Sequence, residues 1–300
     1  MAAEVTNAPA IELPQSVRAP VSPARKALRR FRRHRLAMLG VVIIAVLIVA
    51  ALVGSESAAL LPNLRESNKP PSLAHPFGTD RTGRDVLART LVGGRVSLSV
   101  GLVAVLFSTL IGTTLGALAG YRRGWVDAII MRFVDMVMSF PVIVLLLAVV
   151  AIVGPGIFKI MIMIGLLTWT TPCRIVRAQF LSLREKEYVE AARCLGMTDF
   201  DVARRHILPN ALAPLLVYAS FGVATAVLLE AGLSYLGLGV QPPTPSWGNM
   251  LNTARSISTM ERTAWQWIPP AITTVLFVLA VNFVGDGIRD AIDPRTLFEK

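Results

Sequence analysis

Residues 185–209 read EKEYVEAARCLGMTDFDVARRHILP and form a long polar passage within the apolar second half of the chain. The pattern predicts two short helices. The first contains good helix formers and ends at Gly196, because glycine readily takes the left-handed conformation that ends a helix. Thr198 or Asp199 can cap the second helix, and Pro209 is expected to close it. This hairpin is too small to be a domain, and its size suits docking into a groove on a partner.

The composition is that of a membrane protein. The chain has 300 residues, of which 54% are hydrophobic and 16% charged, and its mean hydropathy is +0.59. Soluble domains are about 45–50% apolar and about 25% charged. The formal net charge of +11 comes from basic residues beside apolar segments, with few aromatic residues among them. That placement indicates membrane topology, and no nucleic-acid partner is expected.

Six apolar segments predict an all-α integral membrane protein with six transmembrane helices. They lie at about 36–53, 96–121, 129–153, 157–175, 211–238 and 267–285. The rest divides into a disordered tail (1–24), a basic flank with the first span (25–54), an external segment (55–95), a core domain (96–289, with the loop 185–209) and a C-terminal tail (290–300). A cleaved signal peptide is the alternative for the first span, but its apolar region would be shorter, at about 7–15 residues.

The basic residues also predict the orientation. An even number of spans places both termini on one side, and most of the 30 Lys and Arg residues fall in the segments of that side. Cytoplasmic flanks of membrane spans are enriched in Lys and Arg. We therefore expect both termini and the hairpin at 185–209 to be cytoplasmic, in a multi-pass protein of the cell membrane.

The hairpin resembles the cytoplasmic EAA loop of the permease subunits of ABC importers, on the spacing of Glu190-Ala191-Ala192, Gly196 and Leu208-Pro209. In that family the loop forms a coupling helix that docks on the ATP-binding subunit. The resemblance implies an ATPase-coupling surface made of Tyr188, Glu190, Ala191, Ala192, Gly196, Phe200, Leu208 and Pro209. The alternative is an amphipathic helix lying on lipid, which the acidic residues of the segment disfavour.

Three further stretches narrow the resemblance to the C-type permeases of dipeptide and oligopeptide importers, with nickel importers as close relatives. They are HPFGTDRTGRDVLART (75–90), LLEAGLSYLGLGVQPPTPSWGNML (228–251) and GDGIRDAIDPR (285–295). The resemblance covers the chain from about Arg29 onward. It implies the transmembrane domain of a type I ABC importer working by alternating access, with a peptide as substrate, or nickel or another small solute as the alternative. The implied partners are a homologous B-type permease, two ATP-binding subunits, an extracytoplasmic substrate-binding protein and the lipid bilayer.

Two ionisable residues lie in or near spans, where charges are costly and often functional. Asp135 is a candidate for the translocation path, although it could instead pair with Arg132, Arg174 or Arg177. Glu230, with Ser234 nearby, is expected either to face the path or to satisfy a neighbouring subunit. Pro141 is predicted to bend the third span.

Candidates for contact with the binding protein lie in the external segments. Asp80, Arg84 and Asp85 are such candidates, but the favoured alternative is that they brace a rigid cap through internal salt bridges and bonds to backbone amides. Trp247 follows a proline-rich run and could contact the binding protein or lie among lipid headgroups.

The sequence contains no catalytic or metal-binding set. It has no GxxxxGK[ST] phosphate loop, no HExxH and no CxxC. Cys173 and Cys194 lack metal-binding neighbours. We therefore expect no enzyme and no cofactor in this chain, and the resemblance places ATP and magnesium on the partner subunits. A membrane-embedded enzyme would need clustered aspartates or a metal site, and a stand-alone carrier would need a line of intramembrane charges.

Overall fold

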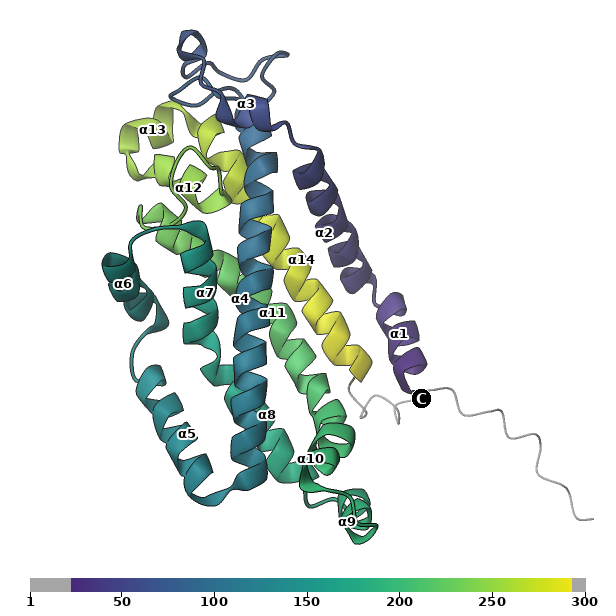
Figure 1. The fold of residues 1–300 in the computed structure, drawn as a ribbon. Helices are drawn as coiled ribbons and strands as arrows, with labels where there is room; N and C mark the ends of the chain where they lie inside the picture. The colour runs from purple at the N-terminus through teal and green to yellow at the C-terminus, as the bar shows by residue number, and fades with distance from the viewer. Residues whose placement is uncertain (1–22, 293–300) are drawn as a thin grey trace, which may run out of the picture.

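The computed structural model describes residues 23–292, and within that range the regular elements are helices (Figure 1). The all-α prediction is thus confirmed for the described part of the chain. Residues 1–22 of the predicted disordered tail and residues 293–300 of the predicted C-terminal tail lie outside the described residues.

Five helical stretches of the described chain are long and apolar enough to cross a membrane, and a bent pair of helices makes a sixth. The first is α2 (Arg35–Val53), which follows the short helix α1 (Pro23–Arg33). The others are α4 (Val86–Arg122), α7 with α8 (Ile157–Thr168 and Thr170–Leu183), α11 (Leu208–Tyr235) with the short helix before it, and α14 (Ile268–Ile292).

The bent pair consists of α5 (Gly124–Met138) and α6 (Val142–Val153), whose axes differ by 83°. The break contains Pro141, as the sequence predicts. Proline has no N–H to donate, and its ring collides with the preceding turn of a helix. The N–H of Ser139 closes the end of α5 on the carbonyl oxygen of Asp135 at 3.0 Å. The third apolar segment is therefore two helices at a sharp angle.

Helix α4 begins at Val86, whereas the sequence predicted a span from 96. The carboxylate of Asp85 caps it by accepting the N–H of Ala88 at 2.8 Å. Gly93 and Gly94 therefore lie inside a helix, where close neighbours fill the space that side chains would take. α14 also continues past the predicted end of its span at 285, so that Asp290 belongs to the helix.

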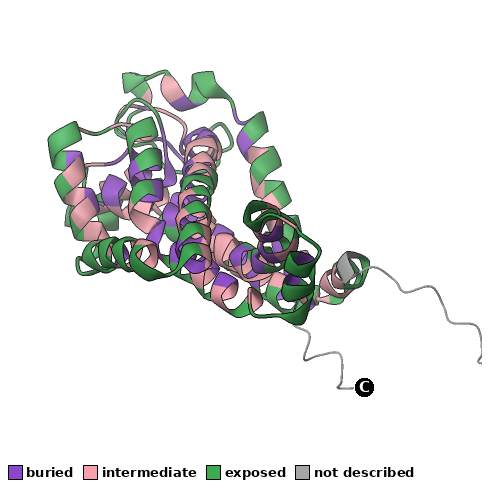
Figure 2. Cartoon of the chain, turned by 60° about the horizontal axis from the view of Figure 1, so that its bottom comes forward, coloured by how far each residue is buried: buried purple, intermediate pink, exposed green. Residues whose placement is uncertain are grey.

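Helix α4 runs the height of the bundle, and α7, α8, α11 and α2 pack around it (Figure 1). Its contact with α8 depends on small residues. A Cβ atom at Gly112 would lie only 2.8 Å from the carbonyl oxygen of Trp169. Backbones can approach this closely only where a side chain is absent. Buried residues gather along the centre of the bundle, and exposed residues cover its periphery (Figure 2).

Short helices form the two ends of the molecule (Figure 1). One end carries α3 (Glu56–Leu60), α12 (Trp247–Leu251) and α13 (Ile257–Arg262). The opposite end carries α9 (Glu187–Cys194) and α10 (Asp199–Val202). The polar hairpin and the predicted external segments are therefore at opposite ends of the bundle.

The second half of the hairpin differs from the prediction. A π-helical turn (Ala203–Ile207) leads from α10 directly into α11, so Pro209 does not close a helix. Pro209 instead lies in the first turn of α11, where a missing N–H costs little. Thr198 is the cap, since its side chain accepts the N–H of Asp201 at 3.2 Å. Gly196 has a φ of +83°, as expected for the residue that ends α9.

Candidate functional site

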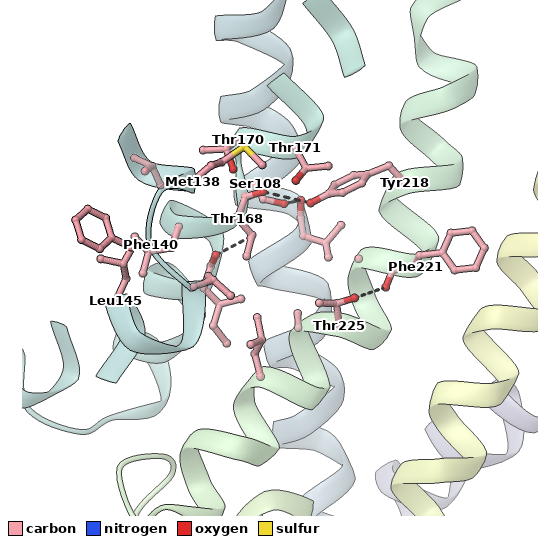
Figure 3. A pocket seen from close by; sticks show the side chains of 18 residues that line it. Ser108, Met138, Phe140, Leu145, Thr168, Thr170, Thr171, Tyr218, Phe221 and Thr225 are labelled. Carbon is pink, nitrogen blue, oxygen red and sulfur yellow. Dashed lines mark hydrogen bonds between the residues drawn. The ribbon is translucent and has the colours of Figure 1, made fainter. Parts of the chain in front are cut away.

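A cavity of about 380 Å³ lies beside the broken span, between α4, α5, α6, α7, α8 and α11 (Figure 3). No Asp, Glu, Lys, Arg or His residue of the described chain lines it. Six of its lining residues carry hydroxyl groups: Ser108, Thr168, Thr170, Thr171, Tyr218 and Thr225. The remainder of the lining is apolar, including Val105, Met138, Phe140, Leu145, Ile164 and Leu229.

The breaks in two spans place these side chains. The bend at Pro141 brings Met138 and Phe140 to one wall of the cavity. The junction of α7 and α8 places Thr168, Thr170 and Thr171 at another. Such hydroxyl groups can bond a polar solute without fixing it by charge. Transport requires binding weak enough for the solute to leave again.

Hydrogen bonds within the lining fix the hydroxyl groups (Figure 3). The Tyr218 hydroxyl donates to the carbonyl oxygen of Thr168 at 3.2 Å, and the Ser108 hydroxyl donates to the carbonyl oxygen of Val105 at 3.1 Å. Thr225 donates to the carbonyl oxygen of Phe221 at 3.1 Å. Met138, Phe140 and Thr225 are exposed although they line the cavity, so the cavity is open on one side in this chain.

Asp135, predicted as a path residue, does not line the cavity. Its carboxylate pairs with the guanidinium of Arg174 and is largely exposed. Arg177 pairs instead with Asp127, with Nη2 and Oδ2 2.6 Å apart. Of the partners considered for Asp135, the structure selects Arg174.

Glu230 and Ser234, the other predicted path residues, are buried away from the cavity. Glu230 is 0% exposed and accepts hydrogen bonds from the hydroxyls of Ser97 at 3.2 Å, Ser234 at 2.7 Å and Ser246 at 2.9 Å. Hydrogen bonds of this kind offset the cost of burying a polar group. Glu230 is satisfied within this chain, so it neither faces the cavity nor needs a neighbouring subunit. Its contacts join α4, α11 and α12.

Trp247 is not available as an external contact, because it is only 1% exposed. Its indole N–H donates to the carbonyl oxygen of Thr90 at 2.9 Å, and its ring packs against Phe277. The sequence suggested an exposed aromatic residue, but the start of α12 places the ring between α4 and α14.

Asp80, Arg84 and Asp85 form internal bracing rather than a free surface. The Nε of Arg84 donates to Asp80 at 2.8 Å, and Asp80 also accepts the N–H of Thr82 at 2.8 Å. Burial alone would raise the pKa of Asp80, but bonds from Arg84 and Thr82 outweigh burial and lower this pKa. Of the two hypotheses for these residues, the contacts fit the rigid cap.

His75 joins this cap to α4. Its two ring nitrogens face Asp85 at 2.8 Å and Glu66 at 3.0 Å. The hydrogen bond to Asp85, more than the bond to Glu66, raises the pKa of His75 above its ordinary value. The sequence alone gave no reason to pair His75 with these carboxylates.

The hairpin presents an exposed apolar surface at the opposite end. Leu195 is 85% exposed, Phe200 72% and Tyr188 42%. Glu190, Ala191, Gly196 and Pro209 are also exposed. Two other predicted coupling residues face inward instead: Ala192 is buried, and Leu208 packs on the cluster formed by Val176, Phe180, Val189, Val202 and Ile207.

The hairpin is tied to the end of α4. The Tyr121 hydroxyl donates to Asp199, and Arg123 pairs with Glu185. Arg184 also donates to the carbonyl oxygen of Tyr121 at 2.8 Å. The hairpin therefore contacts α4 directly and continues into α11, and both of these helices line the cavity.

Comparison with known proteins identifies the family. Residues 112–298 match the family described as the inner membrane component of binding-protein-dependent transport systems. Residues 22–71 match the N-terminal transmembrane domain of oligopeptide transport permease C. The chain belongs to this family of C-type transport permeases. The resemblance seen in its sequence is thereby confirmed.

Curated relatives resemble the permease over nearly its whole length. A protein of Brucella suis named as a peptide permease is 47% identical over 284 residues, covering 94% of each chain. The dipeptide transport permease of Alkalihalophilus pseudofirmus is 41% identical, covering 92% of this chain and 91% of its own. The glutathione transport permease of Pectobacterium atrosepticum is also 41% identical, covering 91% of this chain and 92% of its own.

A solved structure supports the predicted fold. An inward-facing form of the MetNI methionine ABC transporter matches with a TM-score of 0.53 and 22% identity, covering 68% of this chain and 96% of that chain. The permease thus has the predicted fold of a type I importer transmembrane domain.

Sequence reasoning missed the cavity lining and Leu195 of the permease. The hydroxyl residues are scattered over α4, α7, α8 and α11, so no local pattern unites them. One signal was present, the dense run Thr168–Trp169–Thr170–Thr171 within an apolar segment. For Leu195 the signal was an apolar residue directly before the glycine that ends a polar helix.

Proposed function

We propose that the permease forms one half of the translocation pathway of an ATP-driven importer of di- and oligopeptides. The uncharged, hydroxyl-lined cavity beside the broken span carries this proposal. Hydroxyl groups can exchange hydrogen bonds with peptide amides, and apolar walls tolerate varied side chains. The names of the relatives, which include peptide, dipeptide and glutathione permeases, support this substrate class.

The open side of the cavity leaves room for a second permease, and a homologous B-type subunit would complete the pathway there. An extracytoplasmic binding protein would deliver the peptide at the end that carries α3, α12 and α13. Both termini and the hairpin would lie in the cytoplasm, in agreement with the distribution of Lys and Arg.

Two ATP-binding partner subunits would bind ATP and magnesium and hydrolyse the nucleotide. The apolar side chains of Tyr188, Leu195 and Phe200 would dock in a groove on one of them. Buried aromatic and aliphatic anchors commonly dominate such interfaces.

Motion of the docked hairpin would reach the cavity along the helices. α10 and the π-helical turn continue into α11, which carries Tyr218 and Thr225. The bonds from Tyr121 link the same hairpin to α4, which carries Ser108. ATP-driven displacement of the hairpin would therefore move two walls of the cavity together and alternate its access between the two faces of the membrane.

The test fills the cavity. Thr225→Phe and Thr171→Phe are prepared in the complete transporter, reconstituted into liposomes with its co-purifying subunits, and uptake of a labelled dipeptide is measured. Both variants should assemble normally and lose most uptake. Thr114→Phe is the control, because Thr114 is an exposed residue of α4 outside the cavity. Wild-type uptake by assembled cavity variants would reject the proposed pathway, and uptake of Ni²⁺ in place of peptide would favour the alternative substrate.

A further inference from the structure

The first helix of the permease carries a dense positive charge. α1 contains Arg25, Lys26, Arg29, Arg30, Arg32 and Arg33, and it contains no acidic residue. Arg25, Arg29 and Arg32 are exposed and recur at helical spacing, so they share one face. The transport function proposed above assigns no role to this face.

Contacts on its other side hold α1 in place. The ring of Phe31 lies against Gly287 of α14, where a Cβ atom would be 3.1 Å from the Phe31 Cε2 atom. The adjacent His34 caps α2 and faces Asp290 of α14, with Nε2 and Oδ2 3.4 Å apart. α1 is therefore a docked helix at the end of a membrane span (Figure 1), and its arginine face is exposed.

A second feature is a cavity beside α2, the helix that follows α1. This apolar cavity of about 280 Å³ lies among α2, α4, α11 and α14, and Ile44, Ile48, Leu102, Phe277 and Val281 help to line it. At 1.5 Å per residue, Ile44 lies about 14 Å beyond Arg35 along α2. Half of the hydrocarbon layer is about 15 Å thick. A hydrocarbon chain that starts at the membrane surface beside α1 is therefore long enough to reach the depth of this cavity.

We propose that α1 and α2 form a binding site for an anionic phospholipid, with the headgroup on Arg25, Arg29 and Arg32 and an acyl chain in the cavity. Charge complementarity selects the headgroup, since each Lys or Arg near an anionic leaflet strengthens association about fivefold. The apolar lining suits a hydrocarbon chain. The site rests on the cytoplasmic orientation proposed above, because that leaflet carries the anionic lipid that the arginine face would meet.

The test measures bound lipid on the full chain. The purified permease is titrated in detergent micelles with dioleoyl phosphatidylglycerol or dioleoyl phosphatidylcholine, and bound lipid is counted by native mass spectrometry. The wild type should prefer phosphatidylglycerol. The triple variant Arg25→Gln/Arg29→Gln/Arg32→Gln should bind it more weakly by at least about tenfold. The matched triple lysine variant keeps the charge and should retain the preference.

Equal binding of phosphatidylglycerol by the glutamine variant and the wild type would overturn the headgroup site and leave these arginines a topological role only. Loss of the preference in the lysine variant would overturn the electrostatic argument. Ile44→Trp should weaken binding of both lipids by filling the cavity, and unchanged binding would overturn the acyl-chain site. The lipid-binding assay needs neither a partner subunit nor an oriented membrane. A negative result would therefore reject the lipid site without bearing on the proposed transport function.

Discussion

The hydroxyl of Tyr121, in the last turn of α4, donates a hydrogen bond to the carboxylate of Asp199 at the start of α10. The guanidinium groups of Arg184 and Arg193 lie over the same ring, 6.0 Å and 5.8 Å from its centroid. One side chain thus connects the central helix of the bundle to both halves of the hairpin. This contact offers a direct test of whether hairpin and cavity move together.

Tyr121→Phe should reduce coupling while leaving the fold intact. The variant keeps the ring beneath the two arginines and loses two hydrogen bonds of the hydroxyl, the one donated to Asp199 and the one accepted from Arg193 at 3.4 Å. Each such bond contributes about 0.5–1.5 kcal/mol. We expect more ATP hydrolysed per peptide taken up by the reconstituted transporter. Tyr235→Phe, at the opposite end of α11, is the control. An unchanged ratio in Tyr121→Phe would exclude this contact from coupling.

Leu195→Asp and Phe200→Asp should each prevent docking of the ATP-binding subunit. Both side chains are more than two-thirds exposed, at 85% and 72%, so the permease itself should unfold at an unchanged temperature. An interface anchor commonly contributes 2 kcal/mol or more, which is a loss of about thirtyfold in affinity. The measurement is co-purification and binding of the ATPase subunit. Leu64→Asp, 74% exposed near the opposite end, should bind normally. Normal binding by both hairpin variants would place the interface elsewhere.

Glu230→Leu should destabilise the permease. The change leaves the hydroxyls of Ser97, Ser234 and Ser246 without their shared acceptor, at a cost of about 1–3 kcal/mol. Glu230→Gln retains an acceptor oxygen and should therefore lose less stability than Glu230→Leu. Thermal unfolding in detergent measures both. Asp135→Asn is the comparison variant. It should lower the free energy of unfolding by at most about 1 kcal/mol, because exposed ion pairs contribute little to stability. A stable Glu230→Leu variant without uptake would restore Glu230 to the translocation path.

The cap around His75 should be most stable on the acidic side of neutrality. Asp85 raises the pKa of His75 in the folded protein, so its contribution to the free energy of unfolding is fully present below about 6.5 and is lost as the pH rises through the raised value. Lys69 and then His75 lower the pKa of Glu66, whose contribution is lost only at acidic pH. Thermal unfolding between about pH 5 and pH 9 should therefore show a decline on the alkaline side.

His75→Gln is the control for this decline, and it should flatten the alkaline side of the curve. An identical pH profile in the wild type and the variant would show that the ion pairs of His75 do not contribute to stability.

Local rules predicted the features that depend on neighbouring residues. Apolar length located the membrane helices, Gly196 marked the end of α9, and Pro141 marked the bend between α5 and α6. The prediction failed at Val86 and Pro209. Helix α4 begins earlier because Asp85 caps it, and α10 runs on through a π-helical turn because Ile207 and Ala211 pack on the hairpin core.

By itself, the sequence determined the class of the protein, since bilayer thickness sets the length of an apolar helix and backbone hydrogen bonding demands helices there. It also determined the family, through motifs that stand in order along the chain. Only the tertiary structure decided which polar side chains are buried or paired and which line a cavity. It buried Glu230 and Trp247, paired Asp80 with Arg84, and gathered Ser108, Thr168, Tyr218 and Thr225 around one cavity. Burial depends on contacts between residues far apart in the chain, which no local pattern records.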